Sequence, residues 1–123
     1  MTTPGGDDIR RFSIEDAEAV RYEHPEIEPY VHLRRVAGEP SIVEVTFPPN
    51  GRLSVHSHPA DTLYVIRSGE FHIEGEGTFV PGDLRWVRAG VAYGPEWAGE
   101  DGAVLLIVAM DGKFGTTWAD AAP

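Results

Sequence analysis

Two histidines separated by a single residue, His56 and His58, are the residues of this sequence whose spacing best suits chemistry. In a β-strand, residues two apart point to the same face, so this pair would present two imidazoles to one space. Paired neutral imidazoles suit Zn²⁺, Fe²⁺, Cu²⁺ or Ni²⁺, and sites that contain histidine also bind Mn²⁺. The alternative is a pair of polar histidines on the surface of a sheet edge. The spacing alone leaves both interpretations open.

The composition restricts both the ligands and the partners. The chain has no cysteine, so any metal must be bound by His, carboxylate or Tyr side chains. Its formal charge of −10 disfavours nucleic acid and anionic membrane surfaces as partners. The first residues lack the features of a secretory signal, and no apolar stretch approaches the ~20 residues of a membrane span, so we expect a cytoplasmic protein.

Short strands separated by turn residues would position the two histidines. A chain of 123 residues fits one domain. Residues 1–40 read as a leader and packing segment with at most one helical turn at 13–18, residues 41–113 as the barrel, and residues 114–123 as a tail. No helical segment long enough for a βαβ crossover lies between the strands, which favours an antiparallel sandwich or barrel. The expected strands are 30–36, 41–47, 53–58, 62–66, 71–74, 78–80, 84–87 and 103–109.

Two motifs in register give the sequence a family resemblance. A glycine, the His-x-His pair and a later glycine are followed by a Pro-Gly-Asp turn and a further glycine. The residues concerned are Gly51, His56, His58 and Gly69 in the first motif, and Gly82 and Gly90 in the second. Over about residues 41–109 the chain thus resembles the cupin family. The resemblance implies an all-β fold, a double-stranded β-helix or cupin jelly-roll barrel, with a short irregular N-terminal segment and a small-molecule pocket.

The sequence departs from the cupin pattern at positions that matter for a metal. Thr62 stands at the position of the usual carboxylate ligand and Tyr93 at that of the last histidine, while Arg88 and Trp97 replace a proline and an asparagine. Two of the four usual ligands are therefore missing. Either a third ligand comes from elsewhere in the chain, or the site has lost its metal.

His72 and Glu74 are the candidates for that third ligand. They share a face on the strand after the Ser68-Gly69 turn, and some cupins that look similar take a carboxylate from this strand. Either residue would complete a three-ligand site. The alternative is that Phe71 and Ile73, which alternate with them, face the core and leave His72 and Glu74 in solvent.

Tyr93 is expected to point into the barrel, because it occupies the family's fourth ligand position. A neutral phenol with a pKa near ~10 is a poor metal ligand unless the metal deprotonates it. We therefore expect Tyr93 to act as a catalytic proton donor or acceptor, with a ligand role and simple core packing as the alternatives. His24 and His32 lie outside both motifs. His24 is expected to be a surface loop residue, and His32 is either a surface residue of a strand or a pocket residue.

The same registers predict the wall of the pocket. Thr62, Tyr64 and Ile66 share a face, as do Leu84 and Trp86 on a later strand. An aromatic, mostly apolar cavity would suit a small organic molecule. The alternative is that these side chains simply fill the barrel, as they do in many small barrels.

Two classes of function follow from these residues. The first is an enzyme that uses a divalent transition metal (Fe, Mn, Ni or Zn, identity open) on a small organic substrate, such as an aromatic or a carbonyl compound. It would act as a dioxygenase or as an isomerase or lyase. The second is a non-catalytic module that binds or senses a small ligand at a degenerate metal site. Resemblance to small cupins also implies a homodimer, formed through sheet faces or exchanged N-terminal strands.

Overall fold

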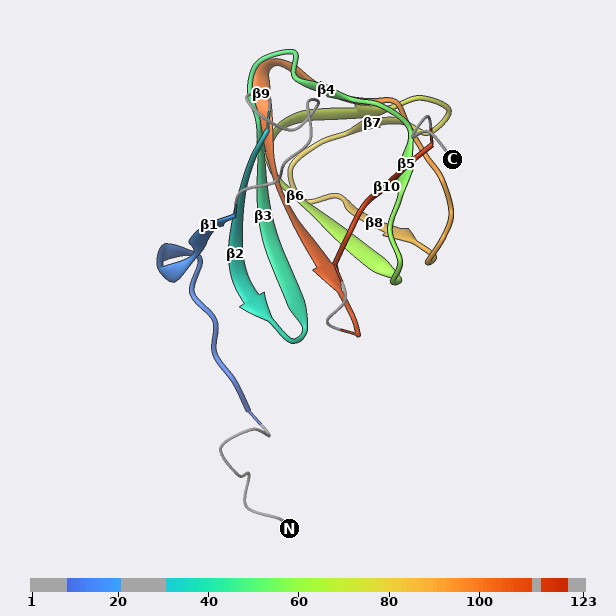
Figure 1. The fold of residues 1–123 in the computed structure, drawn as a ribbon. Helices are drawn as coiled ribbons and strands as arrows, with labels where there is room; N and C mark the ends of the chain where they lie inside the picture. Colours follow the sequence, from blue (N-terminus) through green and yellow to red (C-terminus); the bar gives the residue numbers. More distant parts are fainter. Residues whose placement is uncertain (1–8, 21–30, 112–113, 120–123) are drawn as a thin grey trace.

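The computed structural model describes residues 9–20, 31–111 and 114–119 (Figure 1). Within these ranges the only helical element is the single turn η1 (Ile14–Asp16), as the sequence predicts. The strands are β1 (Glu18–Val20), β2 (His32–Gly38), β3 (Ser41–Phe47), β4 (Arg52–Leu53), β5 (His56–Ser57), β6 (Thr62–Ile73), β7 (Gly77–Phe79), β8 (Leu84–Val87), β9 (Glu96–Ala109) and β10 (Thr117–Trp118). The expectation of an all-β fold is confirmed.

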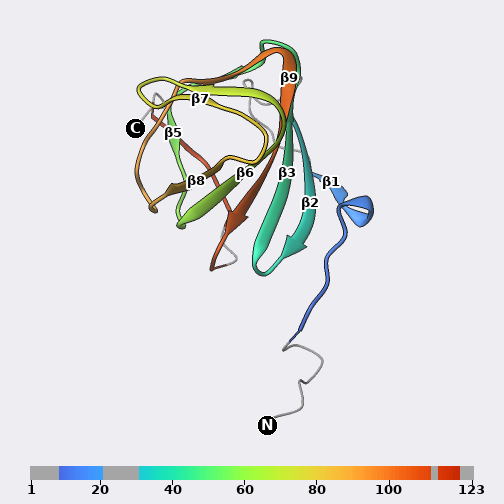
Figure 2. The same cartoon turned by 180° about the vertical axis from the view of Figure 1, so that it is seen from behind.

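Two long strands organise the barrel. β6 and β9 pair with each other in antiparallel register from Thr62↔Ala109 to Ile73↔Glu96. Around them the sheet runs in the order β1-β2-β3-β9-β6-β7, with β4 added to β9 and β8 added to β6, while β5 pairs with β10 in a second, small sheet. Figures 1 and 2 show the strands curling around one interior, with β2 and β3 on one side and β5 and β8 on the other. This closed arrangement is the expected jelly-roll barrel.

The predicted turn at Ser68-Gly69 is instead a pair of irregularities inside β6. The register with β9 shifts between Ile66 and Ser68 and again between Gly69 and Phe71, so the strand bends there without ending. Gly69 has a φ of 75°, and a Cβ at this position would collide with the carbonyl oxygen of Gly102. A glycine in a bulge carries the same sequence signal as a glycine in a turn, which explains the difference.

The predicted strand 53–58 is also different, because it splits into β4 and β5. β4 pairs with β9, whereas β5 pairs with β10 from the C-terminal part of the chain. Strands from both flanking segments therefore belong to the sheets: β1 and β2 extend the large sheet, and β10 holds the strand that carries His56. Tyr30, where the first predicted strand would begin, lies outside the described residues.

The apolar part of the interior lies mainly between β3, β6 and β9. Val43, Val45 and Phe47 of β3 are buried, as are Leu105 and Ile107 of β9. The Phe47 ring meets the ring of Phe71 edge-on, with 5.2 Å between centroids. Each such side chain contributes roughly 1.5–3 kcal/mol by leaving water, so this packing stabilises the barrel independently of any ligand.

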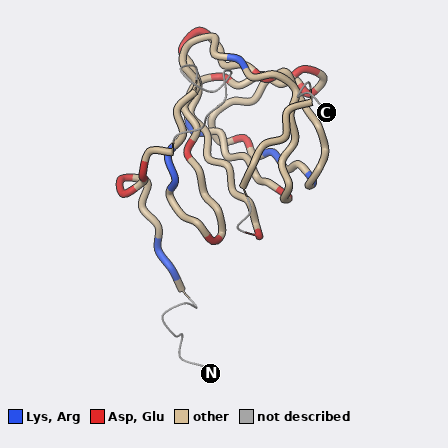
Figure 3. Tube along the Cα trace, viewed as in Figure 1, with Lys and Arg blue, Asp and Glu red and all other residues tan. Residues whose placement is uncertain are grey.

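Charged residues lie both in turns and on the strands, and Glu44 of β3 and Glu96 of β9 are buried. Figure 3 shows that many of the Asp and Glu residues lie in turns, for example at the β2–β3 hairpin and beside η1. Among the described residues, no helix has the length and apolar character needed to cross a membrane.

Candidate functional site

Both histidines of the His-x-His motif point into the barrel. His56 is 2% exposed and His58 is 5% exposed, so the surface interpretation of the pair is wrong. The local backbone explains the orientation of His56, which exchanges two hydrogen bonds of 3.0 Å with Tyr93. Residues directly opposite in such a pair present their side chains to the same face. Tyr93 therefore faces inward beside His56, as predicted.

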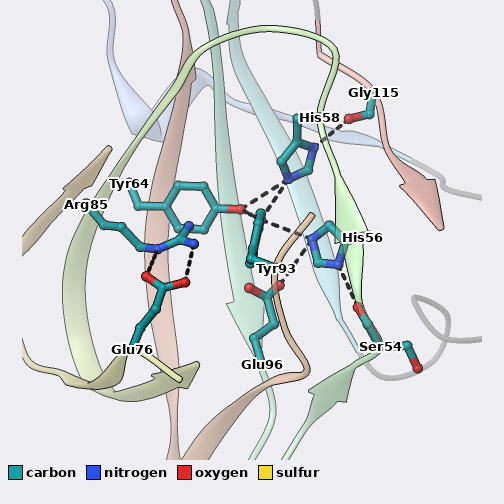
Figure 4. Close-up of polar contacts among 9 residues, drawn as sticks. All are labelled: Ser54, His56, His58, Tyr64, Glu76, Arg85, Tyr93, Glu96 and Gly115. Atoms are coloured by element: carbon teal, nitrogen blue, oxygen red, sulfur yellow. Dashed lines mark hydrogen bonds and ion pairs between the residues drawn. The ribbon is translucent and has the colours of Figure 1, made fainter. Parts of the chain in front are cut away.

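Backbone carbonyls fix the tautomer of each imidazole. Nδ1–H of His56 donates to the carbonyl oxygen of Ser54 at 2.7 Å, and Nδ1–H of His58 donates to that of Gly115 at 2.6 Å (Figure 4). With the proton on Nδ1, the Nε2 atom of each ring carries a lone pair that faces the interior. This is the arrangement found where histidines bind metals, since the second nitrogen is held by a hydrogen bond.

Two tyrosine hydroxyls meet these lone pairs. The hydroxyl of Tyr93 lies 3.0 Å from Nε2 of His56 and 2.9 Å from Nε2 of His58, and the hydroxyl of Tyr64 lies 3.1 Å from Nε2 of His58. The two hydroxyls also contact each other. Burial raises the pKa of Tyr64 well above its ordinary value, so this phenol stays protonated at neutral pH. Two imidazoles and two phenols therefore converge on one point.

Burial also keeps the imidazoles neutral. It lowers the pKa of His58 to about 4, against the opposing effect of the Gly115 carbonyl, and the charges of His56 and Arg85 lower it further. The pKa of His56 is lowered as well, again mainly by burial. Neutral imidazoles are the forms that can accept a proton or bind a cation.

Glu96 is the third kind of group in the site, and the sequence did not predict it. Its side chain is 3% exposed and its Oε1 atom lies 3.6 Å from Nε2 of His56. Burial raises the pKa of Glu96 to about 8, although the positive charge of Arg85 opposes this. At neutral pH both side chains are thus mainly uncharged, and the contact is no ion pair. The Oε2 atom of Glu96 is buried without a hydrogen-bond partner.

Arg85 lies behind the tyrosines. It is 7% exposed, and its guanidinium makes two hydrogen bonds of 2.6 Å to the carboxylate of Glu76. The guanidinium carbon lies 4.1 Å from the ring centroid of Tyr93 and 5.1 Å from that of Tyr64. The paired cation therefore packs against both phenols whose hydroxyls reach the histidines.

The position of Arg85 shows why Trp86 does not line the pocket. Strand β8 alternates as expected, but Leu84 and Trp86 are 63% and 55% exposed, while Arg85 and Val87 are buried. The prediction for Trp86 is wrong because it placed the apolar side chains inside. Arg85 instead lies in the polar interior at this end of the barrel.

His72 and Glu74 lie away from the site, so the prediction that either is the third ligand is wrong. His72 is on the outer face of β6, where its ring stacks on Trp97 at 5.4 Å and 17°. Glu74 is exposed. Phe71 and Ile73 take the inward positions, because apolar burial decides the face of this part of the strand.

The remaining predicted residues have mixed positions. Tyr64 reaches the histidines, whereas Thr62 is fully buried on the same inner face but does not line the cavity. His32 is exposed on β2, and His24 lies outside the described residues. No group of three or more His, Asp or Glu side chains in the described part of the chain forms a ready metal site.

A small cavity opens beside the histidines. Its volume is about 30 Å³, and His56, His58, Tyr64 and Glu96 form its polar wall. The other lining residues are mostly apolar and come from the residue before β2, from β2, β3, β4 and β9, and from the C-terminal residues 114–118: Val31, Leu33, Val45, Phe47, Leu53, Ile107, Phe114, Thr116 and Trp118. The C-terminal lining residues carry no periodic signal in the sequence, because their strand is only two residues long.

The comparisons with known proteins bear on the fold. No protein-family model matches the chain, and no curated protein matches its sequence. Among solved structures, the polyketide cyclase RemF from Streptomyces resistomycificus has a TM-score of 0.71 at 16% identity, over 93% of this chain and 87% of that one. A sugar phosphate isomerase from a cupin superfamily, from Silicibacter pomeroyi, has a TM-score of 0.64 at 16% identity, over 93% and 96% of the two chains.

A third structure describes the architecture directly. A protein with a double-stranded β-helix domain from Klebsiella pneumoniae matches with a TM-score of 0.65 and 18% identity, over 91% of this chain and 98% of that one. Each match spans nearly the whole of both chains, so the likeness extends to the complete barrel. The chain therefore has the cupin fold, a double-stranded β-helix.

Proposed function

We propose that this protein is an enzyme that binds a divalent transition metal at His56 and His58 and acts on a small organic substrate. The observation that carries the proposal is the convergence of two Nε2 lone pairs, each fixed by a backbone carbonyl on the other side of its ring. Imidazole nitrogen donors favour Fe, Ni or Zn over Ca or Mg, and sites that contain histidine also bind Mn. The metal would supply Lewis acidity or redox chemistry to a bound substrate.

Glu96 is the proposed third ligand, in place of His72 and Glu74. It is the one carboxyl group that the described structure puts against the histidines, 3.6 Å from Nε2 of His56. Its buried Oε2 atom has no hydrogen-bond partner, which is costly unless something else contacts that oxygen. A cation would be such a contact and would favour loss of the proton that burial retains on Glu96. The donor set of two imidazoles and one carboxylate fits a three-ligand site.

Tyr93 is the proposed proton donor or acceptor. Its hydroxyl lies within 3.0 Å of both Nε2 atoms, so it can exchange a proton with either imidazole or with a substrate beside them. Tyr64 contacts the same hydroxyl and would orient it. The apolar wall of the cavity would exclude bulk water from this exchange.

The reaction itself stays open between a dioxygenase type and an isomerase or lyase type. Enzymes with this fold include the polyketide cyclase and the sugar phosphate isomerase named above, which act in different ways. One fold supports many chemistries, so these names support an enzyme without choosing the reaction.

Metal content tests the proposal directly. Protein purified without a chelator or a histidine tag should contain close to one equivalent of Fe, Mn, Ni or Zn by elemental analysis. His56→Ala and His58→Ala should each lose most of it while the barrel stays folded, and Glu96→Gln should weaken binding by about 10–100-fold. His72→Ala is the matched control, since it makes the same change on the outer face. Metal retained in both His56→Ala and His58→Ala would contradict the proposal.

Tyr93→Phe separates the roles of the phenol. As a proton donor or acceptor, Tyr93 contributes about 10²–10⁴-fold to turnover, so the variant should keep its metal and lose activity to that extent. Loss of metal would instead assign it as a ligand. Full activity with full metal content would remove Tyr93 from the mechanism.

One observation favours a second candidate, a non-catalytic module that binds or senses a small ligand. The Tyr64 and Tyr93 hydroxyls already donate to both Nε2 atoms, so the histidines are hydrogen-bonded without any metal. Metal-free protein with an unchanged melting temperature after dialysis against each of the four metals would favour this candidate.

A further inference from the structure

The C-terminal segment, residues 114–119, covers the candidate site. The ring of Phe114 stacks on the imidazole of His58, with 5.3 Å between centroids and 25° between planes. The ring of Trp118 packs against His56 at 5.1 Å. Both aromatic side chains also line the cavity. One short stretch of chain therefore contacts both histidines and forms one side of the space beside them.

In the described part of the chain, few backbone hydrogen bonds hold this segment to the barrel. β10 pairs with β5 over two residues only, Thr117↔Ser57 and Trp118↔His56, and the amide of Ala119 donates to the carbonyl of Val55. In contrast, β3 on the facing side pairs with β9 along the whole of Ser41–Phe47 and with β2 on its other edge. Local opening begins where the fewest hydrogen bonds must break, so the segment is held more weakly than the facing wall formed by β3.

The size of the cavity requires some wall to move. A volume of about 30 Å³ holds a few water molecules at most. Pockets that bind organic ligands enclose roughly 300–1,000 Å³. A substrate can therefore reach the histidines only after the cavity widens, and β3, β6 and β9 are fixed in the continuous sheet.

We propose that residues 114–119 form the movable wall of this cavity and that Phe114 and Trp118 determine which ligands reach His56 and His58. The ligand class is a small, uncharged aromatic or aliphatic molecule, because the facing wall consists of side chains such as Leu33, Val45 and Phe47. The inference rests on the proposed function in taking the cavity as the ligand site, but it does not depend on a metal.

Opening of the segment also changes the site. The carbonyl of Gly115, which accepts the proton of His58 Nδ1 at 2.6 Å, belongs to the same stretch of chain. When the segment moves away, His58 loses the bond that fixes its tautomer and orientation. Ligand entry and the state of His58 are therefore coupled.

Cavity-widening variants test the selection of ligands. Benzene, indole and naphthalene are titrated into the full-length protein in the presence of a chelator, with binding followed by NMR chemical shifts. Phe114→Ala and Trp118→Ala should bind indole and naphthalene at least about tenfold more tightly than the wild type, as an engineered apolar cavity does. Trp86→Ala is the matched control, since it removes the same side chain from the outer face.

Hydrogen exchange tests the movement. The amide of Ala119 should exchange at least about 100-fold faster than the amides of the β3–β9 ladder, and bound indole should slow its exchange in Trp118→Ala. Equal exchange at Ala119 and in the ladder would overturn the proposal, as would probe binding in Trp118→Ala and Phe114→Ala no tighter than in Trp86→Ala. If Trp118→Ala is unfolded, Trp118→Phe and Phe114→Ala carry the test. Because the titrations contain a chelator, these effects do not depend on a metal. A protein that shows them but contains no metal when purified without a chelator would contradict only the proposed function.

Discussion

Strands β3 and β8 both alternate between the barrel interior and the outer face, but with opposite chemistry. β3 places Val43, Val45 and Phe47 inside, whereas β8 places Arg85 inside and leaves Trp86 exposed. The interior is therefore divided into an apolar part and a polar part. In the polar part, side chains are held by hydrogen bonds and charge, so the face of a strand cannot be inferred from hydrophobicity alone.

The largest expected effect comes from the apolar part. Phe47→Ala removes a ring that is 2% exposed and packed against Phe71, and should lower the free energy of unfolding by about 3–5 kcal/mol. Urea unfolding followed by circular dichroism measures the loss. A loss below about 1 kcal/mol would show that the apolar part is not what stabilises the barrel.

A titration sharpens the contrast in the polar part. In metal-free protein, Glu96 has a pKa of about 8 when folded against an ordinary value of 4.5, so the folded state holds this proton more tightly than the unfolded state. Its effect is absent below pH 4.5 and destabilises the fold increasingly up to pH 8. Relative to Glu96→Gln, the wild type should therefore lose stability over this window, by at most about 5 kcal/mol.

The comparison with Glu96→Gln is needed because His58 acts in the opposite direction. Its lowered pKa of about 4 makes the fold lose stability as the pH falls below 6.5, in both proteins alike. Urea unfolding at several pH values gives the difference. A constant difference between pH 4.5 and 8 would show that Glu96 ionises normally.

Arg85 and Trp86 are adjacent on β8, and they test directly whether the charged side chain lies inside the barrel and the apolar one outside. Arg85→Met removes two charge-assisted hydrogen bonds to Glu76 and should cost about 2–3 kcal/mol, moderated because Glu76 is 34% exposed. Trp86→Ala removes a larger side chain from the outer face and should cost less than about 1 kcal/mol. Thermal or urea unfolding measures both losses. If Trp86→Ala cost more than Arg85→Met, the assignment of Arg85 to the interior and Trp86 to the outer face would be contradicted.

The outer face of β8 bears on the predicted homodimer. Trp86 lies opposite Leu63, which lies opposite Val108, which in turn lies opposite Ile42, so one apolar row crosses four strands. Large exposed apolar patches mark interfaces, so we expect the protein to sediment as a dimer at tens of micromolar. Trp86→Glu should sediment as a monomer, with a nearly unchanged free energy of unfolding. A dimer that persists in Trp86→Glu would favour exchange of N-terminal strands instead.

Motif spacing predicted the barrel and part of the site. His56, His58 and Tyr93 follow from the strand period and the motif register, because backbone pairing fixes their face. Glu96 and Arg85 do not, because a buried charge at an inward position looks like a solvent-exposed one until its partners are known. Arg85 alternates with Trp86, and the apolar side chain of Trp86 favoured the inner face for Trp86 and the outer face for Arg85.

The contact between Gly69 and Gly102 determines where this sequence can vary. Gly69 has a positive φ and no room for a Cβ beside Gly102, and a Cβ on Gly102 would lie 2.6 Å from the Phe47 carbonyl oxygen. Gly75 and Gly77 also have positive φ, but nothing lies within 4 Å of a Cβ there. In a library of all single substitutions, Gly69 and Gly102 should tolerate no other residue, whereas Gly75 and Gly77 should accept Asn and Asp, the residues that adopt this backbone most readily.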